Sequence, residues 1–116
     1  MRRAIGLAML LILLPGAASA ADGERLFKLQ CKGCHAGGQG DPGPALPGVF
    51  GAKIASRPGF TYSAGLQART GVWDAASLDA FLTSPTAFAP GAVMPKPSLA
   101  TPQDRAAVIE YLKTLR

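Results

Sequence analysis

The stretch Cys31-Lys32-Gly33-Cys34-His35 carries most of the structural information in this chain, because it joins the only two cysteines to the only histidine. Two thiols at this spacing can form thioether bonds to the two vinyl groups of a haem, while the adjacent imidazole reaches the iron. We therefore expect one covalently attached haem c, held through Cys31 and Cys34, with His35 as a ligand of the iron.

Three other chemistries share this spacing: a redox-active dithiol, half of a zinc site and a chance pair. A thioredoxin-like dithiol expects a βαβ context, which the sequence pattern lacks. A tetrahedral zinc site needs four ligands, whereas the chain contains two cysteines and one histidine. These interpretations stay open as alternatives, and covalent haem is the one that the segment favours in an exported chain.

Export is indicated by the start of the sequence, where two arginines precede an apolar run over residues 4–14 and the small residues Ala18-Ser19-Ala20 follow. This order is typical of a secretory signal peptide, and the run is shorter than the ~20 residues that a membrane-spanning helix needs. We predict a signal peptide over residues 1–20, cleaved near Ala20, and a single domain over residues 21–116. The mature protein is then periplasmic and has no membrane span; an uncleaved anchor is the alternative.

The predicted mature chain has a small apolar core for its length. Removing 20 of the 116 residues leaves 96, with 24 large apolar side chains and 21 glycines and prolines. Domains of this size commonly need an additional staple, and a disulfide between cysteines three positions apart closes too short a loop to supply it. The mature net charge is about +3, without a basic run. We expect a cofactor in the core and no nucleic-acid partner.

Helical spacing and capping signals predict an all-α fold with three main helices. The first spans residues 22–31 with Asp22 as its N-cap, and the last follows Thr101 as N-cap with Pro102 in the first turn. Between them, a helix starts near Asp74 and stops before the Ser84-Pro85 pair, because proline disfavours helix in the residue ahead of it.

Long ordered loops are expected between these helices. Glycine and proline recur through residues 36–71 and 85–100, and no alternating run of β-branched residues indicates a sheet. A short helix after Tyr62 is the one regular element that we expect in the first of these stretches.

The second axial position of the iron has one candidate by elimination. Met94 is the only methionine outside the predicted signal peptide, so a six-coordinate iron with histidine and methionine ligands would use His35 and Met94. A lone methionine is more often a core residue. Here, however, it lies in the proline-braced stretch of residues 90–97, which is too irregular to be a buried helix face.

The whole stretch of residues 21–116 resembles a class I cytochrome c, of the mitochondrial cytochrome c and bacterial cytochrome c2 type. The resemblance implies the cytochrome c fold, in which helices and long loops wrap around the haem. Its matching residues include Gly43, Pro44, Leu46, Gly48, Val49, Phe50, Gly51, Pro58, Gly59, Phe60, Thr61, Tyr62, Trp73, Leu82, Pro85, Pro90, Gly91, Met94, Tyr111, Leu112 and Lys113.

The resemblance also implies roles for individual residues. The Pro44 carbonyl accepts the His35 Nδ1 proton, and Tyr62 and Trp73 donate to a haem propionate; plain core packing is the alternative for these two aromatic residues. On the first helix, Gly23 and Phe27 are expected to meet Tyr111 of the last helix, since a glycine lets two helices approach closely.

Several positions depart from the family pattern. The polar network usual beside the methionine ligand is replaced by Leu66, Phe81 and Ala92, which predicts a drier pocket without internal water. Ala52 replaces the arginine usual near the buried propionate. The lysines usual at the exposed haem edge are replaced by Thr86, Ala87 and Val93, although Lys28, Lys32 and Lys96 can supply part of a docking surface. We therefore expect docking that depends less on charge than in lysine-rich relatives.

The resemblance implies a soluble, monomeric, periplasmic one-electron carrier rather than an enzyme. Its expected partners are transiently docked redox proteins: a cytochrome bc1-type complex, a terminal oxidase, a reaction centre or a periplasmic dehydrogenase. Two alternatives remain. An enzyme or gas sensor would have five-coordinate haem and needs a polar distal residue, for which the chain offers no second histidine. A subunit permanently bound to one dehydrogenase would share the same haem site.

Overall fold

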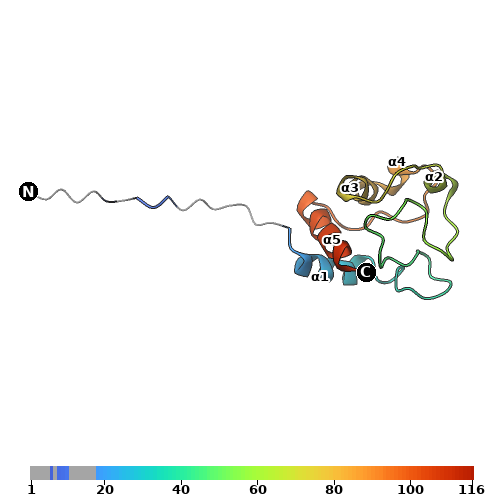
Figure 1. Ribbon diagram of the computed structural model, residues 1–116, viewed down its shortest axis with the longest axis horizontal. Helices are drawn as coiled ribbons and strands as arrows, with labels where there is room; N and C mark the ends of the chain where they lie inside the picture. Colours follow the sequence, from blue (N-terminus) through green and yellow to red (C-terminus); the bar gives the residue numbers. More distant parts are fainter. Residues whose placement is uncertain (1–5, 7, 11–17) are drawn as a thin grey trace, which may run out of the picture.

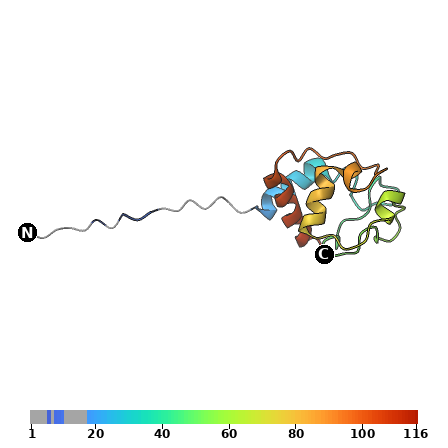
Figure 2. The ribbon, with the colours of Figure 1, turned by 90° about the horizontal axis from the view of Figure 1, so that it is seen from above.

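The computed structural model describes residues 6, 8–10 and 18–116. The predicted signal peptide, residues 1–20, falls mostly outside the described residues. The remainder forms one helical domain in which α1 and α5 lie side by side and a long loop region joins α1 to α2 (Figures 1 and 2).

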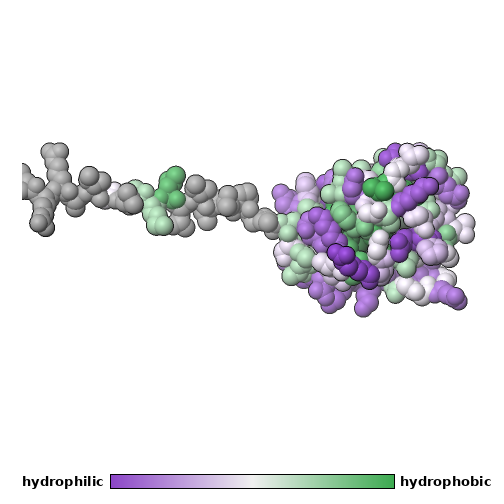
Figure 3. All heavy atoms as spheres, in the orientation of Figure 1, coloured by the Kyte–Doolittle hydropathy of each residue, from purple (hydrophilic) through white to green (hydrophobic). Residues whose placement is uncertain are grey.

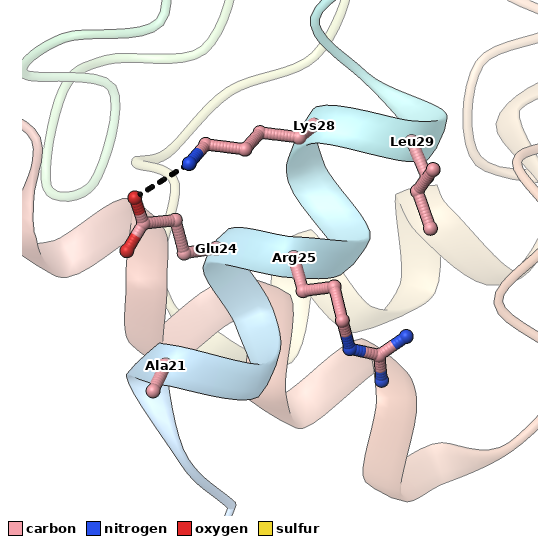
Figure 4. Close-up of a pocket in the computed structure, with 5 residues that line it drawn as sticks. All are labelled: Ala21, Glu24, Arg25, Lys28 and Leu29. Carbon is pink, nitrogen blue, oxygen red and sulfur yellow. Dashed lines mark ion pairs between the residues drawn. The ribbon is translucent and has the colours of Figure 1, made fainter.

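The first helix, α1 (Ala20–Gln30), begins two residues earlier than the sequence predicted. Ser19 is its N-cap, with its hydroxyl accepting from the backbone N–H of Ala21 at 3.2 Å and of Asp22 at 3.4 Å. The prediction of Asp22 as N-cap is therefore wrong. The Asp22 carboxylate lies in the first turn, where it interacts favourably with the positive end of the helix dipole. The outer face of α1 carries an ion pair between Glu24 and Lys28 and also the exposed apolar side chain of Leu29 (Figure 4).

The inner face of α1 packs against α5 (Pro102–Thr114), as predicted. A Cβ atom on Gly23 would overlap the Ala107 carbonyl group, so only glycine allows the two backbones to come this close. One turn further along, the rings of Phe27 and Tyr111 lie 5.2 Å apart at 60°. The predicted contact of the first and last helices is confirmed.

The predicted central helix is α3 (Ala75–Thr83), which packs against α5. Its N-cap, Asp74, forms a reciprocal capping box with Ser77. The Asp74 carboxylate accepts from the Ser77 N–H, and this hydrogen bond lowers the pKa of Asp74.

Two short helices complete the fold. The expected turn after Tyr62 is α2 (Ala64–Gln67), capped by Ser63. A further turn, α4 (Pro85–Phe88), replaces the start of the loop predicted over residues 85–100. Ser84 both ends α3 and caps α4, and Pro85 occupies the first turn, where its missing N–H costs no hydrogen bond. The proline that stops one helix therefore also starts the next.

Loops make up most of the rest of the domain. Lys53 and Val72 form an isolated antiparallel bridge, and no strand occurs in the described part of the chain. The all-α prediction with long ordered loops is therefore confirmed for those residues. Side chains from α1, α3, α4, α5 and the loops meet in one apolar core around a large cavity.

Candidate haem-binding site

One cavity of about 490 Å³ opens between the loops and the helices. Its volume lies within the ~300–1,000 Å³ typical of small-molecule and cofactor sites. Most of the side chains around it are apolar, and a few polar groups converge on it. Among the residues that line it are Cys31, Cys34, His35, Pro44, Arg57, Tyr62, Leu66, Trp73, Phe81, Ala92, Met94 and Lys96. All seven residues predicted for the site therefore border one space.

The two cysteines follow directly after α1 and face this cavity as free thiols. The backbone N–H of Cys31 bonds to the Phe27 carbonyl, and those of Cys34 and His35 bond to the Cys31 carbonyl, so the segment continues α1 as a tight turn. Cys31 is buried, which raises the pKa of its thiol to about 11, whereas Cys34 is exposed. Both sulfurs thus come from one rigid turn at the cavity wall.

The His35 imidazole is held by the loop that follows it. Its Nδ1 lies 2.8 Å from the Pro44 carbonyl oxygen. Since a carbonyl only accepts, Nδ1 carries a proton, and Nε2 is the ring nitrogen that is left for a metal. Gly43 lies against the ring, and a Cβ atom there would overlap it. This local geometry fixes the orientation of the imidazole at the cavity wall.

Met94 reaches the same cavity from the loop between α4 and α5. It is half-buried and packs against the apolar core. Gly65 of α2 lies against the start of this loop so closely that a Cβ atom would overlap the Pro90 carbonyl oxygen. Pro97 is buried on the other side of Met94. The methionine therefore sits on a loop that is fixed at both ends.

The two predicted aromatic residues have different surroundings. The Tyr62 hydroxyl accepts from the Arg57 backbone N–H at 3.1 Å, so its own proton is free to donate. Burial raises the pKa of Tyr62, and the hydrogen bond from the Arg57 backbone N–H and then the Arg57 charge partly oppose this rise. Trp73 is buried and packs against Phe81 and Phe88, with ring centroids 5.2 and 5.5 Å away. The structure thus shows core packing at Trp73, and this packing is compatible with a donor role for its indole N–H.

Arg57 lines the cavity as well, and sequence reasoning missed it. Its guanidinium donates to the Pro47 carbonyl at 2.7 Å. Its Nε is the one buried side-chain nitrogen or oxygen without a hydrogen-bond partner among the described residues. The available signal was the position of an arginine just before Pro58-Gly59, within the stretch that carries the resemblance.

The apolar departures from the family pattern lie where the sequence predicted them. Leu66, Phe81 and Ala92 all line the cavity that Met94 enters, and none of them carries a polar side-chain atom. Phe81 is 9% exposed and packs on Trp73 and Phe88. The methionine side of the cavity therefore offers water few hydrogen-bonding partners.

Comparison with known proteins identifies the family to which this arrangement belongs. The family model for cytochrome c matches residues 20–116. The chain belongs to the cytochrome c family. A cytochrome c2 from Rhodomicrobium vannielii is 43% identical over 121 residues, which covers 97% of this chain and 96% of that protein. A cytochrome c from Cannabis sativa is 37% identical over 102 residues, and the match covers 85% of this chain and 90% of that protein.

The fold of this cytochrome c also matches a solved structure. Cytochrome cH from Methylobacterium extorquens superposes with a TM-score of 0.75 at 37% identity, over 83% of this chain and 98% of that one. The predicted class I c-type cytochrome and its fold are thereby confirmed. As a member of this family, the protein binds one covalently attached haem c and is an electron-transfer protein, not an enzyme.

The residues present fit such a haem. The cavity supplies an apolar enclosure, two thiols at one wall, an imidazole and a thioether, and an unpartnered guanidinium N–H for an anionic group. In the part of the chain that the structure describes, no helix has both the length and the apolar character needed to cross a bilayer.

Proposed function

We propose that this cytochrome c is a periplasmic one-electron carrier with haem bonded to Cys31 and Cys34 and with His35 and Met94 as axial ligands. The observation that carries the proposal is that the Cys-x-x-Cys-His turn and Met94 line one apolar cavity. Pro44, Tyr62 and Trp73 complete this set as residues that orient the cofactor.

Each residue has a definite task in this scheme. A bound haem c supplies an iron that alternates between ferric and ferrous states, one electron at a time. The Pro44 carbonyl fixes the His35 ring and raises its basicity, which favours the ferric state. Tyr62 and Trp73 offer O–H and N–H donors to a propionate, which would otherwise carry a charge into the cavity without a partner.

Met94 would supply the second protein ligand of the iron. Its loop is braced by the Gly65–Pro90 contact and by buried Pro97, so the thioether keeps its place when the charge of the iron changes. With His35 and Met94 both held as ligands, no substrate atom would need to reach the metal, and a small structural change on electron transfer would favour a fast reaction. This is the property that separates a carrier from an oxygen-activating enzyme or a gas sensor.

Carbon monoxide binding to the reduced protein at neutral pH tests this proposal. We expect little or slow binding in the native protein and rapid, complete binding in Met94→Ala, because the variant opens an axial position. Val72→Ala, which shortens a side chain that is 47% exposed and does not line the cavity, is the matched control and should behave as the native protein. Rapid, complete binding by the native protein would contradict methionine ligation and favour a five-coordinate haem.

The periplasmic location rests on the predicted signal peptide and on similarity to a bacterial cytochrome c2. Fractionation of the source cells followed by N-terminal sequencing tests it. The mature protein should be in the periplasmic fraction and begin at or near Ala21. Recovery from the membrane fraction with the first residues retained would support an uncleaved anchor instead.

Transient docking to redox proteins is the partner interaction that we propose, with a cytochrome bc1-type complex, a terminal oxidase, a reaction centre or a periplasmic dehydrogenase as candidates. Cys34 and Val93 line the cavity and are exposed, so a partner can approach the cofactor there. Small, weak interfaces suit rapid turnover. Gel filtration of a periplasmic extract should give a monomer; co-elution with one dehydrogenase would indicate a dedicated subunit.

Docking should depend only weakly on charge. Thr86, Ala87 and Val93 are exposed, and Lys28 is paired with Glu24. Hydrophilic and hydrophobic residues are intermixed on the face seen in Figure 3. Exposed charges attract a partner less as salt screens them. We expect reaction rates with a purified partner to change little between low and physiological ionic strength, and a steep fall would contradict this.

A further inference from the structure

The Arg57 guanidinium is held by loop carbonyls at its two Nη atoms, whereas its Nε atom makes no hydrogen bond. Nη2 donates to the Pro47 carbonyl at 2.7 Å, and Nη1 lies 3.5 Å from the Gly48 carbonyl, at the limit of hydrogen bonding. The Nε atom is buried and has no partner. The loop carbonyls thus fix the orientation of the group without using its remaining donor.

An unpaired donor of this kind needs an explanation. Arginine stays charged inside proteins, and buried donors are almost always paired because an unmade hydrogen bond is costly. No ion pair in the described part of the chain involves Arg57; the three found there join Lys28 to Glu24, Arg105 to Asp79 and Lys113 to Glu110. The partner of Arg57 must therefore come from outside the polypeptide that the structure describes.

The cavity beside Arg57 is suited to an anion. Its titratable lining groups are Arg57, Lys96, Tyr62, His35 and the two thiols, and no aspartate or glutamate is among the residues that line it. The Tyr62 hydroxyl already accepts from the Arg57 backbone N–H, so it too has a proton to donate. A guanidinium N–H and a phenol O–H are therefore available from one loop, with no carboxylate of the chain to receive them.

We propose that Arg57 binds a propionate of the covalently attached haem and keeps that carboxylate ionised. The propionates are the only anionic groups that a haem brings into the cavity, and a carboxylate is the acceptor that a guanidinium fits best. The assignment rests on haem attachment at Cys31 and Cys34, as proposed above, and not on the identity of the sixth ligand. Arg57 is a cofactor-binding residue that anchors the loop carrying Tyr62 at the same time.

Redox titration across pH tests the proposal. In Arg57→Gln holoprotein, the pKa of the bound propionate should rise by about one to three units, because the neighbouring positive charge is lost. The reduction potential should then become pH-dependent in a range where the native potential is flat. Arg57→Lys, which keeps the charge, should restore most of the native profile.

Arg69→Gln is the matched control, since Arg69 is exposed, lies over the Phe88 ring at 3.9 Å and does not line the cavity. It removes the same charge and should leave the pH profile unchanged. Superimposable profiles for native protein, Arg57→Gln and Arg69→Gln would overturn the proposal. A lower melting temperature of Arg57→Gln with an unchanged profile would show that Arg57 serves only the loop.

Unmodified protein provides a second measurement should Arg57→Gln fail to take up haem. Infrared titration of native protein carrying haem labelled with ¹³C at its carboxyl groups should show one propionate that stays ionised well below the pKa of about 4 of a free carboxyl group. Protonation of both propionates near that value would overturn the proposal. Failure of the carbon monoxide test would instead count against Met94 ligation alone.

Discussion

The imidazole of His35 depends on backbone atoms of its neighbours, since Gly43 lies against the ring and Pro44 accepts its proton at 2.8 Å. Gly43→Ala should force the ring or the loop to move, which we expect to lower the free energy of unfolding by about 1–3 kcal/mol in a guanidinium titration. Gly33→Ala is the control, because a Cβ atom there meets nothing within 4 Å. Equal losses in both variants would contradict this role of Gly43.

The side of the cavity near Met94 should hold no ordered water. Leu66, Phe81 and Ala92 provide no side-chain hydrogen-bonding group, whereas a buried water needs two to four polar partners. A high-resolution crystal structure of the holoprotein should show this region dry, and Phe81→Tyr should introduce a water or a new hydrogen bond. An ordered water beside Phe81 in the native protein would contradict the expectation.

Sequence reasoning reached the cofactor residues because their chemistry is rare in this chain. His35 and Met94 could be chosen by elimination, and Cys31 and Cys34 by their spacing. Arg57 could not be found this way. Ten basic residues are scattered through the predicted mature chain, and only the folded loop shows which of them has a buried, unpartnered nitrogen.

At the scale of the elements, the contact between α1 and α5 leaves no room for a side chain at Gly23. Gly23→Ala should place a methyl group against the Ala107 carbonyl and lower the free energy of unfolding by about 1–3 kcal/mol. Leu29→Ala, on the exposed face of the same helix (69% exposed), should change it by less than about 0.5 kcal/mol. Chemical denaturation of both variants measures the difference, and a harmless Gly23→Ala would show that the two helices can separate at no cost.

The starts of the three main helices were predictable to within two residues, whereas α4 was not predicted, and both errors have local causes. The start of α1 was missed because Ser19 lies inside the predicted signal peptide, so its capping hydroxyl was not considered. α4 was missed because Pro85 was interpreted only as a stop, although proline is equally suited to the first turn of a helix. If cleavage follows Ala20 as we propose, the mature α1 begins without its serine cap.

At the scale of the whole molecule, the cavity explains the shortage of large apolar side chains. Of the 24 that the predicted mature chain offers, 13 line a space of about 490 Å³ and do not fill it. The haem is therefore expected to be the largest apolar object in the core, around which loops rich in glycine and proline can be ordered.

Removal of the cofactor should therefore unfold the domain. A chain with Cys31→Ala and Cys34→Ala, prepared without haem, should lose most of its helical signal in far-ultraviolet circular dichroism, because a core around an empty cavity buries too little apolar surface to stabilise so small a domain. The haem-containing native protein is the reference. A native-like helical spectrum from the haem-free chain would mean that the polypeptide alone specifies the fold.

Axial ligation by His35 and Met94 is the claim on which the carrier function depends. The near-infrared magnetic circular dichroism of the ferric protein at neutral pH reports both ligands directly. We predict the signature of histidine and methionine coordination, which Met94→Ala should abolish. A native spectrum of histidine with an amine, for which Lys96 in the cavity lining is the available donor, or of histidine with water, would contradict the account.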